Sequence, residues 1–294
     1  MNLGRIGVCT PAPGLMSATA ARSAVEQIEE LGFGTIWYPE SIGSKEALSQ
    51  GALLLGWTER IVVASGIANI WARDAMATAN GARALTDAFP DRFLLGIGAS
   101  NAASVPLRGH AFSRPLSRMR EYLDAMDDSP YLPPEPEAPV RRILAALGPR
   151  MLKLASERSI GAHPSVVPVE HTAFAREVIG SGSLLAVAQA VLLTTDRTEV
   201  RRIAGEHMSF YLARKPYRDN LERLGWSDSD MEGAGSDALL DAIVAWGDVD
   251  AIGARVQAHF DAGADHVCIQ PLAVKPSDPQ LGQLERLAPA LTEA

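Results

Sequence analysis

Short apolar runs alternate with longer amphipathic stretches through the first third of the chain. The apolar runs begin at Leu3, Phe33, Ile61 and Phe93, so they recur about every 30 residues. Each run is too short for a helix and rich in β-branched or aromatic residues, which predicts buried parallel strands. Between the runs, apolar residues at steps of three and four predict amphipathic helices. Repeated strand–helix units of this kind form either an open doubly wound sheet or a closed barrel.

The unit between Arg60 and Asn101 shows this pattern most clearly. Strands are predicted over residues 61–67 and 93–97, and Pro90 ends the helix between them. Both strands leave through small residues, and Gly66 and Gly98 let another molecule approach the backbone closely. The alternative is that each glycine only relieves crowding at a strand end. Because the exits of parallel strands share one edge of a sheet, the pattern predicts a ligand site at this edge.

The second half of the chain is less regular but contains further strand candidates. A helix is predicted over Pro115–Asp127, and the proline-rich residues 129–139 predict a connection without regular structure. Strands are predicted over residues 142–147, 159–162 and 265–270 and within 184–195, whereas residues 196–262 are predicted to be mostly helical. Eight strands in alternation with helices favour a closed (β/α)8 TIM barrel. We expect one domain over residues 1–294, with insertions in the second half.

The composition is that of a soluble globular protein, with 47% hydrophobic and 21% charged residues. A net charge of −8 gives no cationic surface for nucleic acid or an anionic membrane, so neither is an expected partner. Cys9 and Cys268 are too few for a disulfide framework, and no apolar run is long enough for a signal peptide or a membrane span. We therefore expect a cytoplasmic protein. Metal-ligand spacings such as His-Glu-x-x-His are absent from the sequence, so no dedicated metal site is expected.

In barrels of this class the functional site lies at the carboxyl ends of the strands. This rule places Glu40 at the rim after the second strand and His163 at the rim after the sixth. The turn Gly148-Pro149-Arg150-Met151 joins the fifth strand to a helix, so backbone amides and the Arg150 guanidinium offer a site for a phosphate. The alternative is a tight turn with a solvated arginine.

Four stretches of the chain are similar to one known family. Residues 37–41 (WYPES), 65–74 (SGIANIWARD), 92–98 (RFLLGIG) and 144–151 (LAALGPRM) resemble the bacterial luciferase-like monooxygenase class of oxidoreductases. They are most similar to the actinobacterial branch that uses the deazaflavin coenzyme F-420. The stretches occur in the family's order, and the similarity covers nearly the whole chain. The resemblance implies a luciferase-type (β/α)8 barrel that binds F-420, or alternatively FMN, at the carboxyl rim.

The resemblance also implies a role for each candidate residue. A cis peptide bond between Gly66 and Ile67 would lie behind the deazaflavin ring. The ring and the ribityl chain are expected to contact Glu40, Ala68, Asn69, Gly98, Ala99 and Ser100. The phosphate end is expected to contact Gly148, Pro149, Arg150, Met151, Gly161, Ala162 and His163. The cofactor would carry a hydride to or from a small organic substrate with a carbonyl, alkene or imine group, and the protein would supply a proton. Similar proteins are usually homodimers, so we expect a homodimer.

The proton donor is the least determined part of this prediction. Relatives often have a histidine after the second strand, or a histidine or glutamate after the fourth. This chain has Ser41 and Asn101 there, neither of which is a good acid near neutral pH. Glu40 and His163 are the candidate catalytic residues, although a phosphate contact is the favoured role of His163. His110 and the Arg73–Asp74 pair are further alternatives, and substrate contacts are expected from residues 210–212 and 217–221.

Three functions therefore compete. The first is an F-420-dependent oxidoreductase, the second is a reduced-FMN-dependent luciferase-like monooxygenase, and the third is a non-catalytic barrel that only binds a ligand. The presence of Ser41 and Asn101 in place of the usual acids keeps the third function open.

Overall fold

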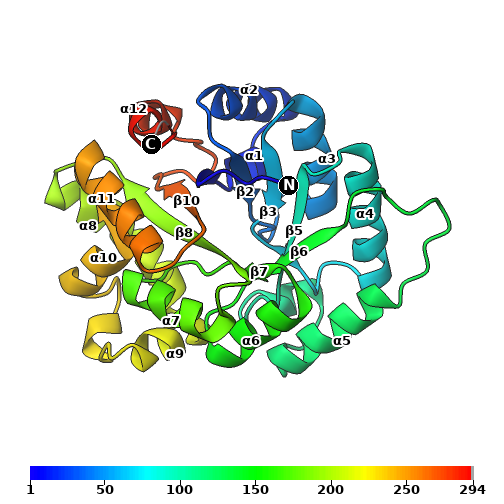
Figure 1. Cartoon of the computed structure of the whole chain (residues 1–294). Coiled ribbons are helices and arrows are strands. Elements are labelled where there is room, and N and C mark those ends of the chain that lie inside the picture. The colour runs from blue at the N-terminus through cyan, green and yellow to red at the C-terminus, as the bar shows by residue number, and fades with distance from the viewer. Residues whose placement is uncertain (293–294) are drawn as a thin grey trace.

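The computed structural model describes residues 1–292 and shows a closed barrel of parallel strands surrounded by helices (Figure 1). The barrel strands are β1 Ile6–Cys9, β2 Thr35–Tyr38, β3 Val62–Ser65, β5 Phe93–Gly98, β6 Arg141–Leu144, β7 Gly161–Ala162, β8 Leu184–Leu192 and β10 His266–Pro271. They pair in chain order around the barrel, and β10 pairs with both β8 and β1 to close it. In the closing pairs Val8 lies beside Ile269, and Cys268 lies beside Ala188.

The eight predicted strands and the closed barrel are confirmed, but two short strands were not expected. Strand β4, Ala68–Asn69, pairs with β5 just beyond the end of β3. Strand β9, Val244–Trp246, pairs with the outer end of β8 and lies in the region predicted to be helical. Three residues are too few to show a period of two, so the neighbouring strand rather than the local sequence determines this element. Strand β6 also ends at Leu144, three residues earlier than the sequence predicted.

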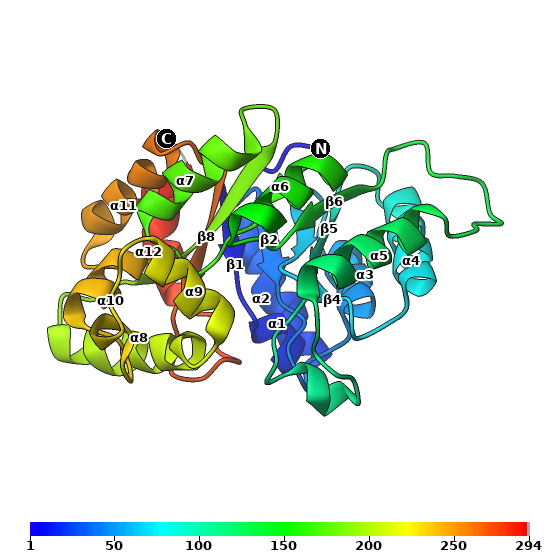
Figure 2. The same cartoon turned by 90° about the horizontal axis from the view of Figure 1, so that it is seen from below.

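Helices alternate with the strands and cover the outside of the barrel (Figures 1 and 2). They are α1 Ala12–Leu15, α2 Ala18–Glu30, α3 Ala47–Trp57, α4 Ala75–Ala88, α5 Pro115–Asp127, α6 Pro149–Arg158, α7 Val169–Ile179, α8 Arg197–Leu212, α9 Lys215–Arg223, α10 Asp237–Ile243, α11 Val249–Asp261 and α12 Leu281–Thr292, with short 3-10 helices η1 Val105–Arg108 and η2 Ser229–Met231. The prediction for α5 is confirmed, and residues 129–139 have no regular structure, as predicted. Within residues 1–292, no helix combines the length and the apolar character needed to cross a bilayer.

Helix starts follow the capping residues that the sequence contains. The Ser17 hydroxyl accepts a hydrogen bond from Ala20 N at 3.3 Å at the start of α2. The Asp196 carboxylate accepts one from Thr198 N at 2.8 Å at the start of α8. Each cap satisfies an amide that has no partner inside the helix, which typically stabilises the helix by about 1 kcal/mol. These local signals fix where the outer helices begin relative to the barrel strands.

The barrel interior and the insertion form separate apolar clusters. The interior cluster contains Cys9, Trp37, Val62, Ala64, Leu94, Ile143, Ala186, Ala188 and Cys268. Helices α8 to α10 and strand β9, which we call the insertion, pack as another cluster against Val166, Leu192 and Leu272. These three residues follow or end β7, β8 and β10, so the insertion lies at the carboxyl side of the barrel. Figures 1 and 2 show α8, α9 and α10 grouped together on that side.

Candidate active site at the carboxyl rim

The exit of β3 forms a bulge at the rim. The Gly66–Ile67 peptide bond is cis, which confirms the expectation drawn from the resemblance. Gly66 N donates to Tyr38 O at 2.7 Å, and Glu40 N donates to Ile67 O at 3.2 Å, so both sides of the bulge are bonded to β2 and its exit. A Cβ added to Gly66 would lie 3.4 Å from both His163 Nε2 and Trp37 Cβ. The bulge therefore lies directly against the side chains that fill the barrel.

The glycines of β5 are explained by this bulge. A Cβ on Gly96 would lie 1.9 Å from Ser65 O, and one on Gly98 would lie 2.3 Å from Ile67 Cδ1. Ser65 Oγ also bonds both Gly96 N and Gly96 O at 2.9 Å, which joins β3 to β5. Ser65 and Ile67 occupy the space beside these two glycines, so the glycines relieve crowding. This is the alternative to a ligand site that the sequence left open for Gly98. Glycine at position 98 is thus required by Ile67 and is not by itself evidence for a ligand.

Two aromatic side chains close the barrel interior below the rim. The rings of Trp37 and His163 stack with centroids 4.2 Å apart and planes 14° apart. Trp37 Nε1 donates to His266 Nε2 at 3.1 Å, and His266 Nδ1 donates to Gly4 O at 2.9 Å. Cys9 is the Cα neighbour of Trp37 in the β1–β2 pair. We call Cys9, Trp37, Gly66 and His163 the floor of the barrel mouth.

His163 is a neutral side chain with a free acceptor. Its Nδ1 lies 2.8 Å from Ala186 O, so Nδ1 carries the proton and Nε2 has a lone pair. Burial lowers the pKa of His163 to about 4, which keeps the ring uncharged at neutral pH. The ring lies inside the barrel against Trp37, not on the loop where a phosphate contact was expected. Gly161 and Ala162 likewise belong to β7, and a Cβ on Gly161 would lie 1.8 Å from Leu184 O.

Glu40 holds the rim together. Its carboxylate pairs with Arg73 and accepts hydrogen bonds from Asn69 N at 2.8 Å and Ala47 N at 3.3 Å. Arg73 also pairs with Glu46 at 2.7 Å, and the Glu40 side chain is only 3% exposed. The structure therefore brings Glu40 and Asn69 together, as predicted. Because the carboxylate accepts from Asn69 N and pairs with Arg73, Glu40 positions the β4 backbone.

The exit of β5 contains polar groups that are engaged locally. Asn101 Oδ1 accepts hydrogen bonds from Ala103 N at 3.0 Å and Ser104 N at 3.1 Å, and so closes a turn. Ser100 has a positive φ of 59°, and Trp71 Nε1 donates to Ala99 O at 2.9 Å. These bonds fix the shape of the rim on this side.

The start of α6 forms a cationic position at the rim. Gly148 precedes α6 without a side-chain cap; Pro149 has no N–H and the Met151 amide bonds Gly148 O, so the Arg150 amide is the one that stays available in the first turn. Arg223, at the end of α9, places its Nη2 3.6 Å from the point where a Cβ on Gly148 would lie. Beside it, His171 Nε2 donates to Leu147 O at 2.9 Å, and His171 Nδ1 is enclosed without a partner among residues 1–292. An anion is the ligand that suits two sources of positive charge at one helix start.

Sequence analysis missed Arg223. The residue belongs to the insertion, far from Gly148 along the chain, and nothing in its local sequence connects it with α6. Arg150, the predicted cation, is exposed in the first turn of the same helix.

Aromatic residues of α8 and α9 pack against one another in the insertion. The ring of Tyr211 lies 4.9 Å from that of His207 and 4.8 Å from that of Tyr217. Leu212, Leu221 and the two tyrosines belong to the cluster that packs against Val166, Leu192 and Leu272. The predicted contact segments 210–212 and 217–221 therefore lie on the carboxyl side of the barrel, although Phe210 is 55% exposed.

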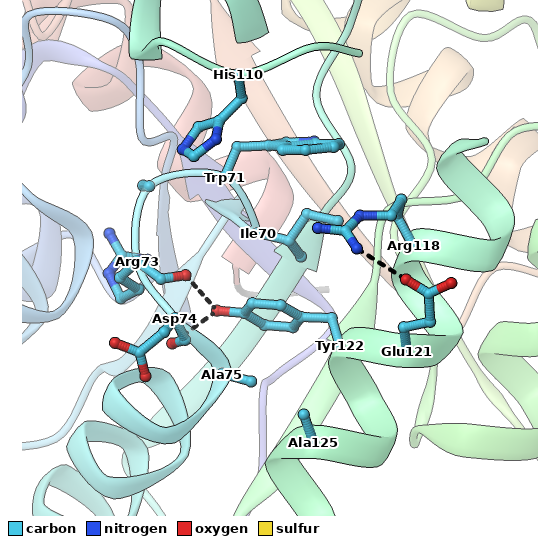
Figure 3. Close-up of a pocket in the computed structure, with 11 residues that line it drawn as sticks. Ile70, Trp71, Arg73, Asp74, Ala75, His110, Arg118, Glu121, Tyr122 and Ala125 are labelled. Atoms are coloured by element: carbon cyan, nitrogen blue, oxygen red, sulfur yellow. Dashed lines mark hydrogen bonds and ion pairs between the residues drawn. The ribbon is translucent and has the colours of Figure 1, made fainter. Parts of the chain in front are cut away.

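A groove of about 430 Å³ lies on the outer side of the rim loop (Figure 3). Residues 70–75 form one side and α5 forms the other, and the Tyr122 hydroxyl bonds Arg73 O at 3.2 Å and Asp74 O at 3.3 Å between them. The His110 ring lies in this groove, 5.7 Å from the Trp71 ring. His110 and Asp74 therefore line this groove and not the floor.

Comparison with known proteins gives one family match. Residues 3–266 match the model of the luciferase-like monooxygenase family. A stretch of 98 residues is 26% identical to 5,10-methylenetetrahydromethanopterin reductase of Methanolobus tindarius, covering 33% of this chain and 30% of that protein. The chain therefore matches less than a third of that relative's length.

Solved structures share the fold. The coenzyme F-420-dependent tetrahydromethanopterin reductase of Methanopyrus kandleri has a TM-score of 0.78 at 17% identity, over 97% of both chains. An F-420-dependent secondary alcohol dehydrogenase in complex with an F-420–acetone adduct has a TM-score of 0.76 at 15% identity, over 99% of this chain and 98% of that one. The oxygenating constituent of 3,6-diketocamphane monooxygenase from Pseudomonas putida, in complex with FMN, has a TM-score of 0.71 at 18% identity, over 98% of both. Because the family model spans most of the barrel, the chain belongs to the luciferase-like monooxygenase family of enzymes.

Proposed function

We propose that this protein is a coenzyme F-420-dependent oxidoreductase that transfers a hydride between the deazaflavin and a small organic substrate. One observation carries the proposal: an uncharged aromatic floor and a cationic helix start face the same rim of one barrel. A flat ring with an anionic tail suits both features at once. The deazaflavin is supported over FMN by the fold shared with the coenzyme F-420-dependent tetrahydromethanopterin reductase of Methanopyrus kandleri and by the 98-residue match to 5,10-methylenetetrahydromethanopterin reductase of Methanolobus tindarius.

The floor suits a ring that must exclude water. Trp37 and His163 are stacked, neutral and almost fully buried, and the backbone of Gly66 and Ile67 lies against them without a side chain at Gly66. His163 Nε2 can accept a hydrogen bond from a ligand N–H or O–H, while its lowered pKa keeps it uncharged. The floor residues therefore bind and orient the ring and do not donate the proton.

The start of α6 suits the anionic end of the cofactor. The amide of Arg150, the guanidinium of Arg223 and the dipole of α6 all favour a negative charge. His171 Nδ1 is enclosed, and burial, with a smaller contribution from the charge of Arg223, lowers the pKa of His171 to about 4. When bound, F-420 supplies the hydride, whereas these residues hold the tail so that the ring reaches the floor.

Equilibrium titration tests the proposal with one matched pair of variants. The wild type is titrated with F-420, FMN and NADPH, and Arg223→Ala and Lys215→Ala are titrated with F-420. Lys215 lies on the same helix as Arg223 but is 84% exposed and paired with Asp219, so it is the control. We expect tight binding of F-420, a loss of about 10-fold or more in Arg223→Ala because a charged hydrogen bond is lost, and a change within twofold in Lys215→Ala.

The other candidate functions give different results in the same titration. Tight binding of FMN alone supports the reduced-FMN-dependent monooxygenase and refutes the proposal. Binding of none of the three cofactors supports a non-catalytic barrel. Equal F-420 affinities for the wild type and Arg223→Ala would show that Arg223 and the start of α6 do not bind the anionic tail.

A further inference from the structure

Arg73 is a buried cation on the rim loop that belongs neither to the floor nor to the anion site at α6. Its side chain is only 10% exposed, and its Nη2 pairs with the carboxylates of Glu40 and Glu46, the latter at 2.7 Å. Its Nη1 is enclosed and has no partner among residues 1–292. Because a buried charge is costly, the position of this cation at the rim calls for a function.

Glu40 connects Arg73 with the bulge. Its two carboxylate oxygens have separate partners: Oε1 accepts from Arg73 and from Ala47 N, whereas Oε2 accepts from Asn69 N at 2.8 Å. The backbone N–H of Glu40 also donates to Ile67 O at 3.2 Å. Glu40 therefore bonds the chain at residue 67 through its backbone and at residue 69 through its carboxylate. Arg73 holds the oxygen that leaves the other one free for Asn69 N.

The backbone of Arg73 is fixed from the opposite side of the rim loop. The Tyr122 hydroxyl of α5 bonds Arg73 O at 3.2 Å and Asp74 O at 3.3 Å (Figure 3). Asp74 in turn caps α4 by accepting a hydrogen bond from Ala77 N at 2.8 Å. The guanidinium therefore extends toward Glu40 from a backbone that two helices hold in place, which is the arrangement that a fixed anchor requires.

We propose that Arg73 is a positioning residue for the cofactor ring and acts through Glu40. The role rests on the proposed function, which puts the ring against the Gly66–Ile67 backbone. Without the cation the Glu40 carboxylate is no longer held at Asn69 N, and the backbone that receives the ring loses its fixed position. Binding must then supply the cost of ordering that backbone, so the ring binds less tightly.

The geometry of the ion pairs makes lysine an informative replacement. Both pairs use the single Nη2 of Arg73, so the planar fork of arginine is not needed at this position. A lysine ammonium is a point charge that can pair with Glu40, whereas the amide of glutamine lacks the charge. Recovery of function with lysine therefore separates the charge of residue 73 from its shape.

Titration with two ligands tests this role. One ligand is F-420, and the other is the same deazaflavin and ribityl chain without the phosphate tail. We expect Arg73→Gln to bind both about 10-fold more weakly than the wild type, and Arg73→Lys to bind both within about threefold. Glu40→Asp should also lose about 10-fold for both, because the shorter side chain keeps its charge but no longer reaches Asn69 N. The double variant Arg73→Gln/Glu40→Asp should lose about 10-fold and not about 100-fold, because the two residues act as one unit.

Glu46→Asp is the matched control, since it shortens the other carboxylate that pairs with Arg73. Glu46 accepts from Leu48 N and Ser49 N at the start of α3, and aspartate is an equally good cap there. We expect affinities within twofold of the wild type for both ligands. Arg223→Ala gives a second contrast, because it should weaken F-420 but not the ligand without the tail.

Other outcomes separate the positioning role from a purely structural one and from the proposed function. A structural role lowers the urea midpoint and the number of binding sites per chain of Arg73→Gln but leaves the Kd of its folded fraction unchanged. That result, or a loss of about 100-fold in the double variant, contradicts the proposal while the proposed function stands. If Arg73→Gln does not fold, Glu40→Asp and Arg73→Lys decide by the same values. If the wild type binds FMN and not F-420, the proposed function fails, and the same variants titrated with FMN decide the positioning role. A wild type that binds neither cofactor contradicts both.

Discussion

Replacement of Gly96 by alanine is expected to lower the free energy of unfolding by about 3 kcal/mol or more, because overpacking of a buried strand is costly. The added Cβ would lie 1.9 Å from Ser65 O, which is backbone and has no rotamer to move away. Both hydrogen bonds between Ser65 Oγ and the Gly96 backbone would be displaced with it. The strands β3 and β5 would separate at the point where the Gly66–Ile67 bulge begins. Urea denaturation followed by tryptophan fluorescence measures the change.

Gly56→Ala is the control for this prediction. Gly56 lies in α3 with nothing within 4 Å of an added Cβ, so alanine there should raise stability by about 0.5–1 kcal/mol. If Gly96→Ala fails to fold, Ser65→Ala gives a second measurement, since it removes the two hydrogen bonds without overpacking. A Gly96→Ala protein within 0.5 kcal/mol of the wild type would show that β3 and β5 are not packed as described.

Stability is expected to fall steeply as the pH drops below 6.5. His163, His171, His259 and His266 are at most 4% exposed. Burial lowers the pKa values of His163, His171 and His266 to about 4 and that of His259 to about 3. Below pH 6.5 the unfolded chain binds protons on these rings that the folded protein does not, so acid favours unfolding. The stabilisation is complete above pH 6.5 and is lost progressively down to about pH 4 for three of the histidines and about pH 3 for His259.

The size of this effect is large compared with ordinary protein stability. Each histidine contributes about 1.4 kcal/mol per pH unit, so four together approach about 5 kcal/mol per unit, against a typical total of about 5–15 kcal/mol. Urea midpoints between pH 7 and 5 measure it, in a range where ordinary carboxyl groups of the unfolded chain stay ionised. His266→Gln should lower the slope of unfolding free energy against pH by the equivalent of about one proton, because it removes one titrating ring. The variant should still fold, because glutamine can accept the hydrogen bond from Trp37 Nε1. A stability that is constant from pH 7 to 5 would mean that these histidines are not buried and neutral.

The barrel was predictable from the sequence because its strands are short apolar runs at regular spacing. The prediction was wrong where pairing rather than local pattern decides the structure. Strand β9 forms because residues 190–192 of β8 are available to pair with it. Strand β4 forms because the chain after the bulge runs beside β5, where Asn69 pairs with Gly98. Neither partner can be read from the residues that form the strand.

The site was predictable only in part, for a related reason. Strand ends identified the rim, and the resemblance identified the cis bond between Gly66 and Ile67. The reason for glycine at Gly98 depends on where the Ile67 side chain lies, which no sequence pattern shows. Arg223 lies on an insertion whose approach to Gly148 is set by packing across the barrel. Long-range packing of this kind leaves no periodic signal in a single sequence.

A crystal structure of the protein with bound F-420 tests the central claim most directly, namely that one rim holds a flat ring and an anionic tail together. We expect the deazaflavin ring against the Gly66–Ile67 backbone, above Trp37 and His163, with the phosphate at the start of α6 between Gly148 and Arg223. A ring bound in the outer groove beside Trp71, or a phosphate located away from α6, would contradict it.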